Sequence, residues 1–162
     1  MSTITMDYLF NHKFERTGLE ENVEKKIRKS GMFSKAALGC LPRSDEYRID
    51  EFKIRIIEIV HDKFNSFTKC SLTCNLKYET LRKYKRPEYK QTLSDVMLAK
   101  FVIGCELSLE EAKELFELKG HALLPEKILL DAVIVHCLEN HNDLDEFFAT
   151  CKQVGLDIKY EE

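Results

Sequence analysis

The chain has 162 residues, of which 44% are hydrophobic and 33% are charged, and its formal net charge is −3. The hydrophobic content suffices for a buried core and excludes a disordered chain, while the negative balance excludes a global positive field for nucleic acid. Six glycines and three prolines are too few for a collagen-like or loop-dominated chain, so the composition favours an all-α fold.

The sequence contains no candidate membrane helix and no recognisable secretory signal. The most apolar stretch, Ile128 to Leu138, carries Asp131 and His136 and is too short to span a bilayer. The first seven residues lack a basic region followed by an apolar run. We therefore expect a cytoplasmic protein that does not bind membranes, in which the six cysteines are reduced and buried.

Residues 1–49 are expected to form an N-terminal extension. The tetrapeptide Thr17-Gly18-Leu19-Glu20 matches a capping box, and apolar residues follow at helical spacing as far as Ile27. This pattern predicts one short helix. Glycines, a proline and a polar stretch between residues 31 and 49 then predict a connector, so the main domain is expected to cover residues 50–158.

The main domain is predicted to begin with two helices separated by a short break. Asp50 can cap a helix whose apolar residues run from Phe52 to Phe64. Ser66, with the asparagine before it, can start a second and shorter helix that carries Cys70 and Cys74. These two cysteines are four residues apart and therefore share one helical face.

The remaining helices are predicted from their boundary signals. A segment from Lys77 to Arg86 must end at Pro87, since proline disfavours helical backbone in the residue before it. Four further helices follow: one from Thr92 or Ser94 to a left-handed Gly104, one from the Ser108–Glu111 capping box to Gly120, one from Pro125 to Leu138, and one from Asn142 or Asp143 to Val154.

Positive charge is concentrated in residues 77–90. This segment holds six lysines or arginines and two glutamates, so its net charge is +4 while the rest of the chain sums to −7. Three tyrosines lie among the cations. Cations beside aromatic rings suit contacts with phosphates and with bases or sugars, but charge runs are equally typical of solvated helix faces. Composition alone leaves both interpretations open.

The spacing around this segment favours two helices joined by a tight turn. Ser71 is small enough to let the helices cross closely, and Asn75 tolerates the left-handed conformation that a turn requires. An apolar Leu76 follows, and Leu81 and Tyr84 are spaced to face inward from the second helix. This layout is typical of a helix-turn-helix.

Together with the Leu107–Glu111 segment downstream, these features resemble the lambda-repressor-like (XRE-type) helix-turn-helix family. The resemblance covers about residues 50–158. It extends through Leu107–Phe116, Lys119–Leu123 and Cys137–Leu156, which look like small bacterial proteins that join such a domain to a C-terminal helical pair. It implies an all-α fold, with a helix-turn-helix core of about five helices, two C-terminal helices and an N-terminal helical extension.

The resemblance also implies which residues would contact DNA. Residues 77 to about 85 would form the recognition helix, because a helix fits the major groove. The residues that would read bases are Lys77, Tyr78, Glu79 and Lys83, and those that would contact phosphates are Arg82, Lys85, Arg86 and Lys90. Two positions depart from the family pattern: Phe67 replaces a frequent phosphate-binding glutamine, and Lys77 replaces the usual serine or threonine.

These observations predict a sequence-specific transcriptional regulator that binds double-stranded DNA. The C-terminal helices would brace the domain or form a homodimer. The alternative is a protein-interaction or assembly module that keeps a degenerate helix-turn-helix as a scaffold and contacts a toxin, phage or defence component. Fold alone does not decide between these functions.

Other candidate sites have simpler explanations. Two groups could in principle hold a metal: Cys70 and Cys74 with Cys40 or His61, and His136 and Cys137 with His141. In the resemblance Cys70 and Cys74 occupy core positions, so we expect no metal and no cofactor. The usual catalytic motifs are absent from the sequence, and Asp131 and His136 lie on different faces of a helix, so we expect no enzyme.

Overall fold

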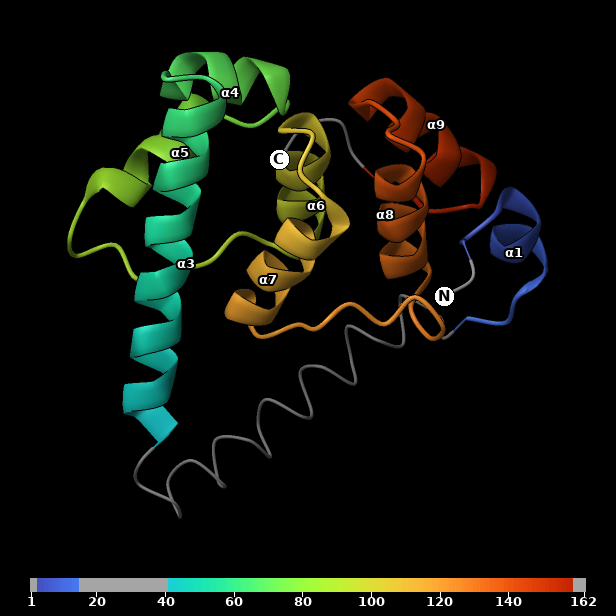
Figure 1. The fold of residues 1–162 in the computed structure, drawn as a ribbon, viewed down its shortest axis with the longest axis horizontal. Helices are drawn as coiled ribbons and strands as arrows, with labels where there is room; N and C mark the ends of the chain where they lie inside the picture. Colours follow the sequence, from blue (N-terminus) through green and yellow to red (C-terminus); the bar gives the residue numbers. More distant parts are fainter. Residues whose placement is uncertain (1–2, 15–40, 159–162) are drawn as a thin grey trace.

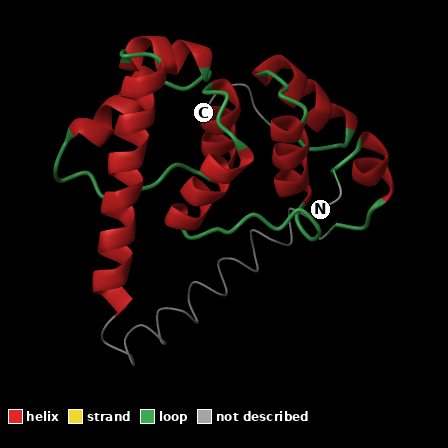
Figure 2. Ribbon diagram, in the orientation of Figure 1, coloured by secondary structure: helices red, strands yellow, loops and turns green. Residues whose placement is uncertain are grey.

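The computed structural model describes residues 3–14 and 41–158. Within these ranges the chain is all-α, as predicted, and has no strand (Figures 1 and 2). The elements are α1 (Met6–Asn11), α3 (Leu41–Lys63), α4 (Phe67–Thr73), α5 (Tyr78–Arg82), the 3-10 helix η1 (Lys83–Lys85), α6 (Asp95–Gly104), α7 (Leu109–Lys119), α8 (Leu129–Glu139) and α9 (Leu144–Gln153). The helix expected from Thr17 lies outside the described residues. None of the described helices combines the length and apolarity needed to cross a bilayer.

Two helices, α6 and α8, form the centre of the molecule. Every residue from Leu98 to Ile103 in α6 and from Asp131 to Leu138 in α8 is buried. A helix buried on all sides must be surrounded by other elements. Accordingly α9 contacts both central helices, while α7 and α1 contact α8. Figure 1 shows α8 with α9 and α1 beside it.

The long helix α3 packs against α4 and η1. It begins at Leu41, so the prediction of a connector up to residue 49 is wrong over its last nine residues, and the expected boundary at residue 50 falls inside the helix. Pro42 is the second residue of α3, a position where the missing N–H costs no hydrogen bond. Further along, Phe52 and Ile56 are fully buried, as expected.

Residues 3–14 are attached to α8. Ile4 and Leu9 belong to the buried core. The backbone N–H of Ile4 donates to Glu139 at 2.9 Å, and its carbonyl lies 2.7 Å from Nδ1 of His136. No local sequence pattern indicates these contacts, because they join positions more than 130 residues apart.

Two helices begin where the sequence predicts, and each begins with a capping box. Ser108 and Glu111 exchange hydrogen bonds at the start of α7, and Asp143 and Glu146 do so at the start of α9. Gly120 ends α7 in the left-handed conformation, with a φ of 97°.

Two other boundaries differ from prediction. Gly104 does not take the left-handed conformation; Glu106 does, with a φ of 55°. Gly104 is required for another reason, since a Cβ there would lie 2.7 Å from Sγ of Cys74. The helix expected to start at Pro125 begins instead at Leu129, because residues 125–127 form a turn.

Candidate nucleic-acid interface

The candidate interface consists of α4, the turn at residues 74–77, α5, η1 and the loop that follows to Lys90. Ser66 caps α4 by accepting a hydrogen bond from the backbone N–H of Lys69 at 3.2 Å. In the turn, Asn75 has a φ of 53°, the left-handed conformation expected for it. Ser71 and Leu76 are buried beneath the turn. The predicted pair of short helices joined by a tight turn is therefore present.

Two buried lysines attach this unit to the rest of the molecule. Lys100 of α6, only 1% exposed, donates to the carbonyl of Asn75 at 2.8 Å. Lys53 of α3 donates to the carbonyls of Arg86 at 2.8 Å and Pro87 at 3.4 Å. A buried ammonium must be hydrogen-bonded, so each lysine fixes the position of a backbone segment on either side of α5. Neither lysine could be recognised from the sequence, since their acceptors are backbone atoms.

The second helix is shorter than expected. The predicted segment, Lys77 to Arg86, contains the five α-helical residues of α5 and the single 3-10 turn η1. Arg86 is extended, with a φ of −84° and a ψ of 127°, as steric contact with the following proline requires. Leu81 and Tyr84 are buried as predicted, and the Tyr84 ring packs against those of Phe52 and Tyr89.

The eight predicted DNA-contacting residues all reach the surface. Arg82 and Lys83 are partly exposed, and the other six are exposed: Lys77, Tyr78, Glu79, Lys85, Arg86 and Lys90. Several of them contact other groups of the protein. Lys90 forms an ion pair with Asp50 of α3, and the Lys83 ammonium lies 5.9 Å from the centroid of the Tyr89 ring.

Glu79 and Arg82 form an exposed ion pair on α5. Arg82 donates from Nε and Nη2 to the two carboxylate oxygens of Glu79, at 3.2 and 2.8 Å. This hydrogen bonding lowers the pKa of Glu79 and raises that of Arg82. An exposed pair of this kind contributes little to stability, so either partner can leave the pair and contact a ligand at small cost.

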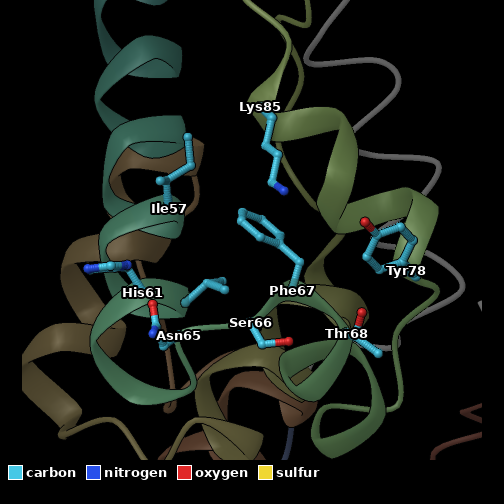
Figure 3. A pocket seen from close by; sticks show the side chains of 9 residues that line it. Ile57, His61, Asn65, Ser66, Phe67, Thr68, Tyr78 and Lys85 are labelled. Atoms are coloured by element: carbon cyan, nitrogen blue, oxygen red, sulfur yellow. The ribbon is translucent and has the colours of Figure 1, made fainter.

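A groove of about 460 Å³ lies beside α5, between α3 and η1. Figure 3 shows Phe67 in its middle, with the Lys85 ammonium directed at the ring and Tyr78 on the side of α5. The Lys85 nitrogen is 4.5 Å from the Phe67 ring centroid. His61 lines the opposite side of the groove. From the sequence, Phe67 is only a departure from the family pattern, whereas in the structure its ring lies in the middle of a groove that Lys85 also lines.

The structure adds a different third member to the Cys70 and Cys74 grouping that was considered from the sequence. Cys40 lies outside the described residues, and His61 lines the groove. Among the residues described, the one group of at least three His, Cys, Asp or Glu side chains close enough to hold an ion is Cys70, Cys74 and Cys105. Cys105 was not predicted to join this group, because it lies at the end of α6, thirty-one positions after Cys74.

His121 and His136 have structural partners. His136 interacts with the carbonyl of Ile4 at 2.7 Å, and His121 with Asp131 at 2.8 Å. Asp131 and His136 therefore have different partners and do not form an acid–base pair.

No family model, curated protein or solved structure matches this chain. The family resemblance therefore stays a prediction from the residues quoted above.

Proposed function

We propose that this protein is a cytoplasmic, sequence-specific DNA-binding regulator that uses α4, the turn and α5 as a helix-turn-helix. One observation carries the proposal. The turn and the two buried lysines hold α5 and η1 with Leu81 and Tyr84 inward, which leaves the cationic side at the surface. This is the arrangement that a helix needs to enter a major groove.

The length of the exposed helix limits what it can read. Five α-helical residues extend about 7.5 Å, and the 3-10 turn adds roughly 6 Å. A segment of this length fits a major groove about 12 Å wide, but it presents only three or four side chains to base edges. Lys77, Tyr78, Glu79 and Lys83 would take these positions. Two copies of the chain on adjacent half-sites would read a longer sequence.

Phosphate contacts would provide most of the affinity. Lys85 is the last residue of η1 and lines the groove that contains Phe67, and Arg86 follows it in the chain. Arg82 would leave Glu79 and bind a phosphate, and Lys90 would leave Asp50 and bind another phosphate. Both ion pairs are exposed, so this exchange costs little.

The alternative function, a protein-interaction module, is supported by the same ion pairs. Pairing with Glu79 and Asp50 neutralises Arg82 and Lys90, two of the four cations proposed to contact phosphates. A protein partner would not require that these charges be released.

Salt dependence separates the two functions. The test measures binding of the full chain to duplex DNA from upstream of its own gene, at rising salt concentration. With the four proposed phosphate-contacting cations, one chain should lose roughly two orders of magnitude in affinity between 50 and 200 mM salt. Arg86→Ala should weaken binding to all sequences and flatten the salt slope by about one unit, whereas Lys83→Ala should change sequence preference.

Lys152→Ala serves as the matched control, because Lys152 is an exposed cation on α9. It should bind as the wild type does. If the wild type and all three variants bind DNA equally and negligibly, the proposal of a DNA-binding regulator is rejected. The protein-interaction module is then the remaining function.

A further inference from the structure

Three buried thiols meet where α4 and α6 end. Cys70 lies in α4, Cys74 is the C-cap of α4, and Cys105 is the C-cap of α6. Sγ of Cys74 lies 3.9 Å from that of Cys70 and 3.7 Å from that of Cys105, and all three sulfurs lie within 4.8 Å of one another. We propose that these three cysteines form a three-coordinate thiolate site for a soft, thiophilic metal ion, Cu(I).

The spacing of the sulfurs fits an ion bound between them. A point equidistant from the three lies roughly 2.2–2.5 Å from each, and metal–thiolate bonds are about 2.3 Å long. Gly104 is what permits this approach, since any side chain there would overlap Cys74. The three ligands therefore converge without a change in backbone position.

The donor set selects the metal. Thiolates favour Cu(I), zinc and iron–sulfur clusters, and structural zinc sites have four protein ligands. Over residues 3–14 and 41–158, no histidine or carboxylate joins the three sulfurs. Cys70 and Cys74 are 0% exposed and Cys105 is 3% exposed, so the site has no open side for a water ligand. Three sulfurs in a dry site match a three-coordinate Cu(I) ion better than tetrahedral zinc.

A buried cation lies beside the cluster. Three thiolates and one monovalent ion carry a net negative charge, which is costly in an apolar interior. The ammonium of Lys100 donates to the carbonyl of Asn75, the residue that follows Cys74, so a positive charge lies next to the cluster. It therefore offsets part of the charge that metal binding creates.

The cluster also has a route to solvent. Cys74 is followed by Asn75 and Cys105 by Glu106, and both following residues are exposed and left-handed. Each of these sulfurs is thus covered by one turn, and local opening of that turn would admit an ion. Once bound, the ion would cross-link the end of α4 to the end of α6.

The cysteines outside the cluster provide a control for the metal titration. Its other cysteines, Cys40, Cys137 and Cys151, complete the set of six. The full chain, reduced and free of metal, is titrated with Cu(I) without oxygen in competition with a Cu(I) chelator, and thiolate-to-copper ultraviolet absorption is followed. We expect one ion per chain, the same affinity when those other three cysteines are replaced by serine, and a loss of about 100-fold or more in Cys105→Ser.

X-ray absorption of the wild-type complex tests the site without relying on any variant, and three sulfurs at about 2.2–2.3 Å are expected. Failure of the reduced wild type to compete for Cu(I) would overturn the proposal. So would full binding by Cys105→Ser, loss of binding in the triple serine variant, or tight zinc binding with four ligands in place of Cu(I). A parallel titration with zinc distinguishes the last outcome.

Discussion

One buried ion pair should give the protein a measurable pH dependence of stability. Asp131 is 0% exposed, and its Oδ2 accepts hydrogen bonds from His121 at 2.8 Å and from the backbone N–H of Leu124 at 2.9 Å. These bonds attach the segment between α7 and α8 to the first turn of α8. Because the carboxylate favours the imidazolium, its hydrogen bond raises the pKa of His121.

The sign of the pH effect follows from this direction. Since the folded pKa of His121 lies above the unfolded value of about 6.5, the stabilisation is complete below about pH 6.5 and is lost as the pH rises through the folded pKa. A hydrogen bond to a charged group contributes about 1.5–3 kcal/mol. Asp131→Asn weakens two such bonds, so near pH 6 we expect a loss of about 2–4 kcal/mol.

Thermal unfolding followed by circular dichroism between pH 5 and 9 is the assay. For a chain of this length, that loss corresponds to a fall in Tm of roughly 5–15 °C at the acid end. The difference between wild type and Asp131→Asn should shrink towards alkaline pH. His121→Gln, which keeps a donor but does not titrate, should remove the same pH-dependent part. A difference that is constant with pH, or that grows towards alkaline pH, would refute the reasoning.

Three other predictions follow from named contacts. Gly104→Ala should cost about 1–3 kcal/mol, because its Cβ would lie 2.7 Å from Sγ and 2.9 Å from Cα of Cys74; an unchanged urea midpoint would contradict that close approach. Tyr84→Phe should leave stability unchanged or raise it by about 1 kcal/mol, because the buried Tyr84 hydroxyl has no hydrogen-bond partner among the described residues; a clear drop in Tm would show that it has one. Glu79→Gln, which rests on the proposed function, should strengthen binding to non-cognate duplexes and change sequence preference, because it releases Arg82 and removes a base-reading carboxylate; unchanged binding in both respects would place Glu79 outside the interface.

Local chemistry explains which parts of the fold could be predicted. The capping boxes at Ser108 and Asp143 and the left-handed Asn75 and Gly120 act within a few residues of themselves. The predicted start of α3 was wrong because Pro42 was interpreted as a loop residue, although a helix accepts proline in its first turn.

The rest depended on distant contacts. Gly104 was assigned to a turn, but its role is set by Cys74, thirty positions earlier in the chain. The surface exposure of the candidate interface, in contrast, could be predicted, because the spacing of Leu81 and Tyr84 places both inward. Neither the ion pair of Lys90 with Asp50 nor the anchoring by Lys53 follows from any local pattern.

The most direct test of the proposed function is to map which backbone amides respond to DNA. A 15N-labelled full chain is titrated with the tightest-binding duplex selected from a random pool, and amide chemical shifts are followed by NMR. We predict that the largest changes fall on residues 77–90 and on the start of α4, with small changes in α9. Changes centred on α9 or α1, or the absence of any selected duplex that binds, would contradict the proposal.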